Sequence, residues 1–253
     1  MIDPNEWPQA LWLVRHGESA GNLARDAAHA SGRERIELAT RDVDVPLSDR
    51  GVEQAQALGA WFAHQPKTEA PQCILASPYR RAVDTAQIVR RHIAQSEETP
   101  AVIVDERLRE KEFGILDRLT RQGIEKFYPD QAEIRRALGK FYHRPPGGES
   151  WCDVILRLRS ALNTLSLHYS GRRVLIVGHQ VVVLCFRYLL EKLSEADILR
   201  IDSQGDVANC SITHYALGGA PPQLRLVKYN WTVPLEADGA PVTAAPDVNE
   251  GTR

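Results

Sequence analysis

Basic side chains that could bind and attack a phosphoryl group follow three short apolar segments of the sequence. They are Arg15-His16-Gly17 after residues 11–14, Arg80-Arg81 shortly after residues 73–76, and Gly178-His179 after residues 174–177. A neutral imidazole can attack phosphorus directly, and an adjacent guanidinium can hold phosphate oxygens through two parallel N–H donors. The glycine after His16 would let the backbone turn sharply there. One Arg-His pair alone is weak support for catalysis, but three basic groups in equivalent positions indicate a phosphate site.

The apolar segments predict the elements that would position these groups. Four runs are typical of buried parallel strands, at residues 11–14, 73–76, 102–104 and 174–177. Between them, Ser48 is a suitable N-cap for a helix, and residues 78–91 repeat apolar side chains at helical spacing. This alternation predicts an α/β fold: a three-layer α/β/α sandwich with a mainly parallel central sheet and helical lid insertions. The basic groups would then converge at one edge of the sheet, where the parallel strands end.

A basic cluster alone binds phosphate without cleaving its ester, so a proton donor for the leaving oxygen is also required. Leu108-Arg109-Glu110 follows the third predicted strand and offers Glu110 as that acid. The sequence then contains R-H-G-E-S, S-P-x-x-R-A, L-R-E-x-x-x-G and G-H, in this order. In these motifs, from about Leu11 to Ala216, the chain resembles the histidine phosphatase superfamily, also called the phosphoglycerate mutase-like family. Four such motifs in this order are specific to that family.

The resemblance implies a role for each motif residue. His16 is the nucleophile that becomes phosphohistidine, and Arg15, Arg81 and His179 form the phosphate pocket. Glu110 is the general acid that later helps water attack the phosphoenzyme, although the neighbouring arginines oppose its protonation. The implied activity is hydrolysis of a phosphomonoester by a metal-independent phosphatase of the histidine acid type. It would require no cofactor and would act on a small phosphorylated substrate.

Further residues are candidate contacts to phosphate or substrate. Asn22 matches the asparagine six residues after the family's nucleophile, and Ser19 closes the R-H-G-E-S motif. Gln180 replaces the small residue usual after His179, so its side chain either adds an amide donor near the phosphate or alters the local backbone. A second departure follows Gly114, where the family's acid-glycine ending is absent. Both departures bear on substrate specificity, and neither removes a catalytic group.

Residues 144–150 resemble the P-x-G-E-S element of family phosphatases, whose loop closes near the active site. Glu149 and Ser150 are then either substrate contacts or the cap of a helix that begins at Trp151. Capping is favoured as the primary role, because Ser150-Trp151-Cys152-Asp153 fits a helix start by itself.

Three other functions compete with phosphatase activity. A mutase of the same superfamily would return the phosphoryl group from His16 to a bound intermediate. Mutases carry an R-R-S-[FY]-D segment, of which residues 135–139 keep only the arginine pair, and this favours a phosphatase. A weakly active, phosphate-recognising regulatory module would be expected to lack His16 or Glu110, and both are present. Nucleic-acid binding through residues 135–144 predicts a larger basic excess with interleaved aromatic side chains.

Residues 1–235 are expected to form a single histidine phosphatase-like domain with lid-like insertions at about residues 23–45 and 115–145. Both insertions lie near strand ends, where α/β proteins bind ligands, so they are candidate lids. Surface helices without substrate contact are an equally good interpretation. Residues 236–253 are rich in Ala, Pro, Gly and Asp, a composition that predicts a disordered tail.

Composition limits the partners and the compartment. Lys plus Arg (31) nearly balance Asp plus Glu (33), so the chain has no net positive charge that would attract nucleic acid or anionic lipid. The 4 cysteines form no C-x-x-C pair, and the opening segment lacks the basic start and apolar block of a signal peptide. Metal motifs such as H-E-x-x-H are absent from the sequence. We therefore expect a cytoplasmic protein with reduced thiols, no metal, and no nucleic-acid or membrane partner. A homodimer is an expectation from the resemblance alone.

Overall fold

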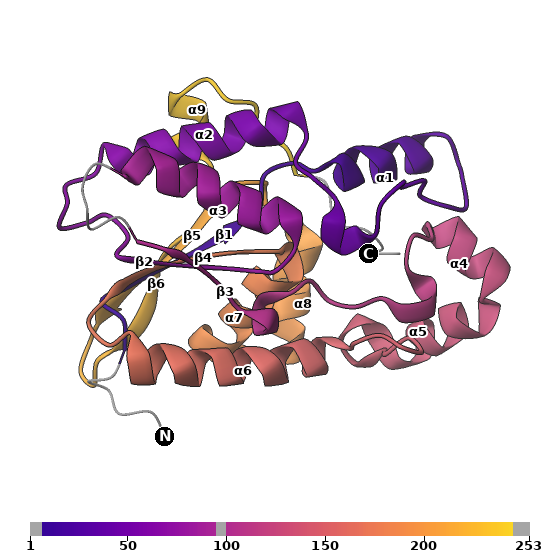
Figure 1. Ribbon diagram of the computed structural model, residues 1–253. Coiled ribbons are helices and arrows are strands. Elements are labelled where there is room, and N and C mark those ends of the chain that lie inside the picture. Colours follow the sequence, from indigo (N-terminus) through magenta and orange to yellow (C-terminus); the bar gives the residue numbers. More distant parts are fainter. Residues whose placement is uncertain (1–6, 95–99, 245–253) are drawn as a thin grey trace.

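The apolar segments of the chain form the strands of one central sheet. The computed structural model describes residues 7–94 and 100–244, and its sheet has the order β3-β2-β4-β1-β5-β6 (Figure 1). Strands β3, β2, β4 and β1 pair in parallel, whereas β5 pairs antiparallel with both β1 and β6. The strands are β1 (Ala10–Arg15), β2 (Cys73–Ala76), β3 (Val102–Val104), β4 (Arg173–Gly178), β5 (Ile212–Gly218) and β6 (Gln223–Trp231).

Two layers of helices cover the sheet, which confirms the three-layer α/β prediction. On one face lie α2 (Asp49–Ala63), α3 (Arg80–Ile93) and the short α9 (Val233–Ala237), and on the other lie α6 (Trp151–His168), α7 (Gln180–Glu191) and α8 (Glu195–Gln204) (Figure 1). Alternate side chains of β1 enter the two cores: Leu11 and Leu13 pack with α6 and α7, and Trp12 and Val14 pack with α2 and α3. Burial of this central strand on both faces explains its continuous apolar sequence.

The antiparallel hairpin of β5 and β6 is not among the strands predicted from apolar runs. Side chains in the second half of β5 are only half-buried, and β6 has one buried side chain, Leu224, among exposed and half-buried ones. Such a pattern contains too few consecutive apolar residues to stand out in the sequence. The hairpin covers the side of β1 that β4 does not, so the nucleophile's strand lies inside the sheet rather than at its edge.

Both predicted insertions contain helices, and they pack against each other. The first includes α1 (Ala20–Ala30) and the short helix η2 (Asp42–Asp44); the second includes η4 (Gly114–Leu116), α4 (Arg121–Phe127) and α5 (Pro129–Tyr142). The amide of Ile36 donates to the carbonyl of Arg118 at 2.9 Å, and the amide of Thr120 donates to that of Glu34 at 3.0 Å. We call residues 31–48 and 114–128, joined in this way, the paired lid.

The stretch expected to be a disordered tail makes specific contacts up to Thr243. Helix α9 packs against α2, and the side-chain amide of Gln54 donates to the carbonyl of Pro241 at 2.9 Å and to Thr243 Oγ1 at 2.8 Å. Composition did not predict that this segment is ordered, because hydrogen bonds rather than buried apolar side chains attach most of it to the domain. The rest of that prediction, residues 245–253, lies outside the described residues. Within residues 7–94 and 100–244, no helix is both long and apolar enough to cross a bilayer.

Candidate active site

His16 lies directly after β1 and is fully buried. Its backbone amide donates to the carbonyl of Gly178 at 2.9 Å, which continues the pairing of β1 with β4. The ring Nδ1 is 2.7 Å from the carbonyl oxygen of Gly17. Because a carbonyl can only accept, Nδ1 carries the proton and Nε2 keeps its lone pair. The ring is therefore held in the tautomer whose Nε2 can act as a nucleophile.

Arg81 directs its guanidinium at that nitrogen. It is the second residue of α3, the helix that the apolar spacing of residues 78–91 predicted. Nε donates to Nε2 of His16 at 3.2 Å, and Nη1 and Nη2 donate to the carboxylate of Asp42 at 2.9 and 3.3 Å. The Tyr79 ring lies against the same guanidinium, 4.8 Å from its carbon. The cation is thus fixed beside the candidate nucleophile.

Arg15, the last residue of β1, is fully buried and held by two acceptors. Its Nη1 donates to the carbonyl of Val207 at 2.6 Å and to Oε1 of Gln180 at 3.3 Å. The amide nitrogen of Gln180 in turn donates to Asp206 Oδ1 at 3.0 Å. Gln180 therefore links Arg15 to Asp206. Direct contact of Gln180 with phosphate stays a prediction.

His179 and Glu110 complete the cluster on the other side of His16. The ring centroids of His16 and His179 are 5.1 Å apart, and Nδ1 of His179 lies 3.5 Å from Oε2 of Glu110. Nε2 of His179 is 2.7 Å from Oγ of Ser77, the serine of the S-P-x-x-R-A motif. The structure thus brings four of the five predicted catalytic residues into direct contact, with Arg15 preceding His16 in the chain.

The loop that carries Glu110 is anchored by Glu149. The carboxylate of Glu149 accepts hydrogen bonds from Arg109 at 2.7 Å, from Arg157 at 3.0 Å and from the backbone amide of Glu112 at 3.1 Å. Ser150 is the N-cap of α6 and forms a capping box, as the sequence favoured. Glu149 therefore ties the Glu110 loop to the start of α6, a role that neither alternative for this residue included.

Ser19 and Asn22 form the N-terminal capping box of α1. The backbone amide of Ser19 donates to Oδ1 of Asn22 at 2.9 Å, and the amide of Asn22 donates to Oγ of Ser19 at 3.2 Å. Both side chains are buried beside the nucleophile loop, so the cap fixes where α1 begins. Their predicted contact with phosphate or substrate stays a prediction.

Gly17 is required for a reason other than the sharp turn that we expected. It is not among the glycines with positive φ, but a Cβ at this position would lie 2.5 Å from the carbonyl oxygen of Gly51. The first turn of α2 therefore packs directly against the nucleophile loop, and only glycine allows that approach. The amide of Gly17 also donates to Oγ1 of Thr85 at 3.1 Å.

Sequence reasoning missed three residues that support the cluster. The side-chain amide of Asn209 donates to the carbonyl of His16 at 3.0 Å, and Asp42 binds Arg81 as described above. Burial, followed by the charges of Asp42 and two glutamates, raises the pKa of Tyr79 well above its ordinary value, so its hydroxyl stays protonated. Tyr79 lay inside a recognised motif, whereas Asp42 and Asn209 occur in segments without any pattern that would mark them.

A cavity of about 280 Å³ lies beside the cluster. Its walls come from the paired lid, from Tyr79 and from the chain after Glu110, and include Arg41, Asp42, Lys111, Glu112, Asp117 and Arg118. Burial raises the pKa of the Asp117 carboxyl, and the Asp42 charge adds to that effect. The mixed charge of these walls suits a small polar group attached to a phosphate.

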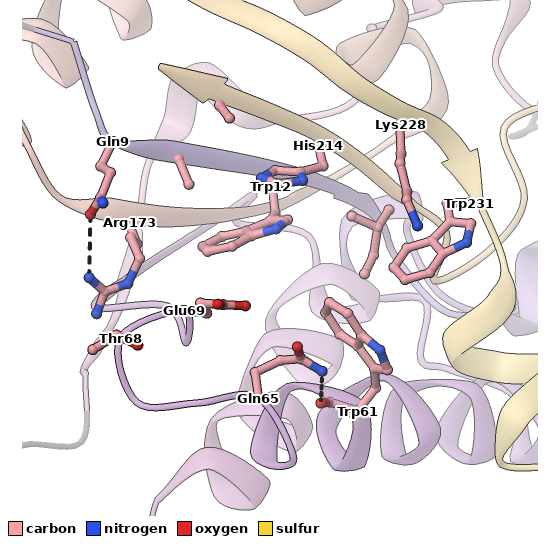
Figure 2. Close-up of a pocket in the computed structure, with 13 residues that line it drawn as sticks. Gln9, Trp12, Trp61, Gln65, Thr68, Glu69, Arg173, His214, Lys228 and Trp231 are labelled. Carbon is pink, nitrogen blue, oxygen red and sulfur yellow. Dashed lines mark hydrogen bonds between the residues drawn. The ribbon is translucent and has the colours of Figure 1, made fainter. Parts of the chain in front are cut away.

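A larger cavity of about 360 Å³ lies elsewhere, between the sheet and the C-terminal end of α2. Figure 2 shows its aromatic wall, in which the rings of Trp12 and His214 stack 5.3 Å apart and Trp61 meets Trp231. The smaller cavity is the candidate substrate site, because Asp42 and Tyr79 in its walls contact the predicted catalytic residue Arg81. In the described part of the chain, no three His, Cys, Asp or Glu side chains gather as a metal site would require.

Comparisons with known proteins identify relatives of most of the chain. The family model of the histidine phosphatase superfamily (branch 1) matches residues 11–232. A 6-phosphofructo-2-kinase/fructose-2,6-bisphosphatase of Gallus gallus is 30% identical over 196 residues, which cover 77% of this chain and 36% of that protein. The corresponding Caenorhabditis elegans protein is 32% identical over 219 residues, or 83% of this chain and 42% of that one. The chain thus spans well under half the length of these relatives.

Solved structures share the fold over most of their length. A mycobacterial glucosyl-3-phosphoglycerate phosphatase is 25% identical with a TM-score of 0.66, and the match covers 88% of this chain and 99% of that one. An alpha-ribazole phosphatase from Shigella flexneri, 22% identical with a TM-score of 0.67, covers 88% and 97% in the same way and supports the fold alone. These matches confirm the layered architecture, and the family model confirms the resemblance found in the sequence motifs.

Proposed function

The chain belongs to the histidine phosphatase superfamily, and on that premise we propose that it hydrolyses a small phosphomonoester through a phosphohistidine at Nε2 of His16. One observation carries the proposal: Nδ1 of His16 is bonded to the carbonyl of Gly17, so Nε2 is the nitrogen with a lone pair. That nitrogen lies between Arg81 and His179, where a phosphate would be held by cationic and N–H donor groups.

In the first step, Nε2 of His16 attacks phosphorus and the bond from phosphorus to the ester oxygen breaks. Arg15 and Arg81 stabilise the charge on the equatorial oxygens through N–H donors of the guanidinium groups. Glu110 gives its proton to the departing oxygen, which leaves as an alcohol. The products of this step are phospho-His16, a Glu110 carboxylate and the free alcohol.

In the second step, water attacks phospho-His16 from the side that the alcohol has left. The Glu110 carboxylate takes a proton from the water, the P–N bond breaks, and its electron pair returns to Nε2. Inorganic phosphate is released, while the Glu149 contacts keep the Glu110 loop in place for both proton transfers. The two arginines supply positive charge in the pocket, so we propose that neither step needs a metal ion.

The test is metal-free turnover of p-nitrophenyl phosphate and a panel of phosphorylated metabolites, comparing wild type with His16→Ala and His64→Ala. His64 is an exposed histidine at the end of α2 and serves as the matched control. Of these three proteins, we expect His16→Ala alone to lose phosphate release. In a further variant, Glu110→Gln, an acid-labile phosphoenzyme should accumulate, because the amide cannot take the proton from water in the second step. Phosphate release that persists in His16→Ala would overturn the proposal. Isomerisation of 3-phosphoglycerate without phosphate release would indicate a mutase instead.

A further inference from the structure

Asp42 in the paired lid binds the guanidinium that the proposed mechanism assigns to phosphate. Arg81 Nη1 donates to Oδ1 of Asp42 at 2.9 Å and to the Asp42 carbonyl at 2.8 Å, and Nη2 donates to Oδ2 at 3.3 Å. Arg81 is 3% exposed, and the side chain of Asp42 is 21% exposed. The carboxylate thus holds an inner cation from the solvent side, along the cavity that would admit a substrate.

The same guanidinium also binds the nucleophilic atom. Its Nε–H donates to Nε2 of His16 at 3.2 Å, and this bond uses the lone pair that must attack phosphorus. A phosphoryl group in line with Nε2 therefore needs Arg81 to turn its N–H donors from the imidazole to the phosphate oxygens. Because Asp42 holds both terminal nitrogens, its contacts oppose that turn.

Carboxylate and phosphate are competitors for one guanidinium, since both accept parallel N–H donors in the same fork geometry. A phosphate bound to Arg81 would also bring a second negative charge next to Asp42, and the two anions repel each other. From this geometry we propose that Asp42 is a positioning residue, which holds Arg81 on His16 and is displaced when a phosphoryl group binds. The inference rests on the proposed function of Arg81 as a phosphate ligand.

The paired lid fixes Asp42 and would respond when it is displaced. Arg118 of the second insertion donates to the carbonyl of Leu38 at 3.2 Å and to that of Thr40 at 2.6 Å, directly before η2. Release of Asp42 from Arg81 leaves these bonds to hold the residues just before η2, while η2 itself loses its hydrogen bonds with Arg81. Phosphate binding would therefore loosen the segment around Asp42, although the ligand itself contacts Arg81.

The experiment compares the affinity of inorganic phosphate for wild type, Asp42→Asn and Asp44→Asn by titration calorimetry. Asp44 is the matched control, because it lies on the same short helix but pairs with Arg41, at 3.0 Å. If wild type spends about nine tenths of its time with Asp42 on Arg81, removal of the carboxylate should tighten phosphate binding about tenfold. We expect KM for p-nitrophenyl phosphate to fall with it, while kcat changes less and Asp44→Asn behaves as wild type.

Phosphate affinity in Asp42→Asn that is unchanged or weaker would overturn the inference, and so would absence of phosphate binding in every variant. Neither result depends on turnover, whereas phosphate release by His16→Ala would refute the proposed function alone. A measurement on wild type covers the case in which Asp42→Asn does not fold. Amide hydrogen exchange of residues 38–45 should become faster with saturating phosphate, and slower or equal exchange would contradict displacement of Asp42.

Discussion

Replacement of Ser77 by alanine tests whether the hydroxyl behind His179 matters to the site. Ser77 is fully buried, and its Oγ lies 2.7 Å from Nε2 of His179, which is itself fully buried. Ser77→Ala removes this hydrogen bond from a ring that is shielded from water. The loss of one partner from a buried hydrogen bond costs about 1–3 kcal/mol.

That cost should appear in catalysis, because His179 is a proposed ligand of the transferred phosphoryl group and contacts Glu110. At about 1.4 kcal/mol per factor of ten, the expected decrease in kcat/KM is about 5-fold to 150-fold. The assay is kcat/KM for p-nitrophenyl phosphate, together with urea unfolding of the same variant. Both quantities are needed, since a structural loss alone would lower stability without a matching decrease in activity.

Ser211→Ala is the matched control for this substitution. Ser211 is also a buried serine, but its hydroxyl has no hydrogen-bond partner among the described residues. Its removal should leave kcat/KM within about twofold of wild type and should not reduce stability. If Ser77→Ala is as active as Ser211→Ala, the interpretation of Ser77 as the residue that orients His179 is wrong.

Three further predictions concern the surroundings of the site. Glu149→Gln neutralises a carboxylate that is 12% exposed and bound by two arginines, so the free energy of unfolding should fall by about 1–3 kcal/mol in urea titrations and kcat should fall with it. Gly17→Ala places a Cβ 2.5 Å from the Gly51 carbonyl and should abolish turnover in the p-nitrophenyl phosphate assay, with a lower melting temperature. Burial, with two nearby cations, lowers the pKa of His143 to about 4, so only the unfolded chain takes up its proton between about pH 6.5 and 4. The free energy of unfolding should therefore fall by up to about 1.4 kcal/mol per pH unit as the pH is lowered from about 6.5 to 4. Urea unfolding at these two pH values should show a smaller decrease for His143→Gln than for wild type.

The sequence predicted the parts of this fold that depend on local apolar patterns. Residues 73–76 and 102–104 are strands as expected, and the arginine pair opens α3, because a strand buried on both faces leaves a continuous apolar run. The hairpin of β5 and β6 escaped the same reasoning, since a half-exposed strand leaves only a weak alternation. Strands such as β5 and β6, which are only partly buried, therefore have to be identified from the structure.

The site shows the same division between local and distant information. His16 and Glu110 stand in recognisable motifs, and the structure places them within one cluster with His179. Asp42 could not be predicted, because its contact with Arg81 joins residues 39 positions apart and its own segment contains several other charges. Gly17 was singled out correctly, but the reason lies in the approach of α2, which no neighbouring residue indicates.

The order of strands in the sheet has a consequence for how the protein is made. Strand β1 pairs with β4 on one side and β5 on the other, and their residues follow it by about 160 and 200 positions. At translation rates of roughly 5–20 residues per second, β1 leaves the ribosome on the order of ten seconds or more before either partner. During that interval an apolar strand and its histidine have no native neighbours to pair with. A truncated nascent chain that ends before β4 should therefore depend on a chaperone to stay unaggregated.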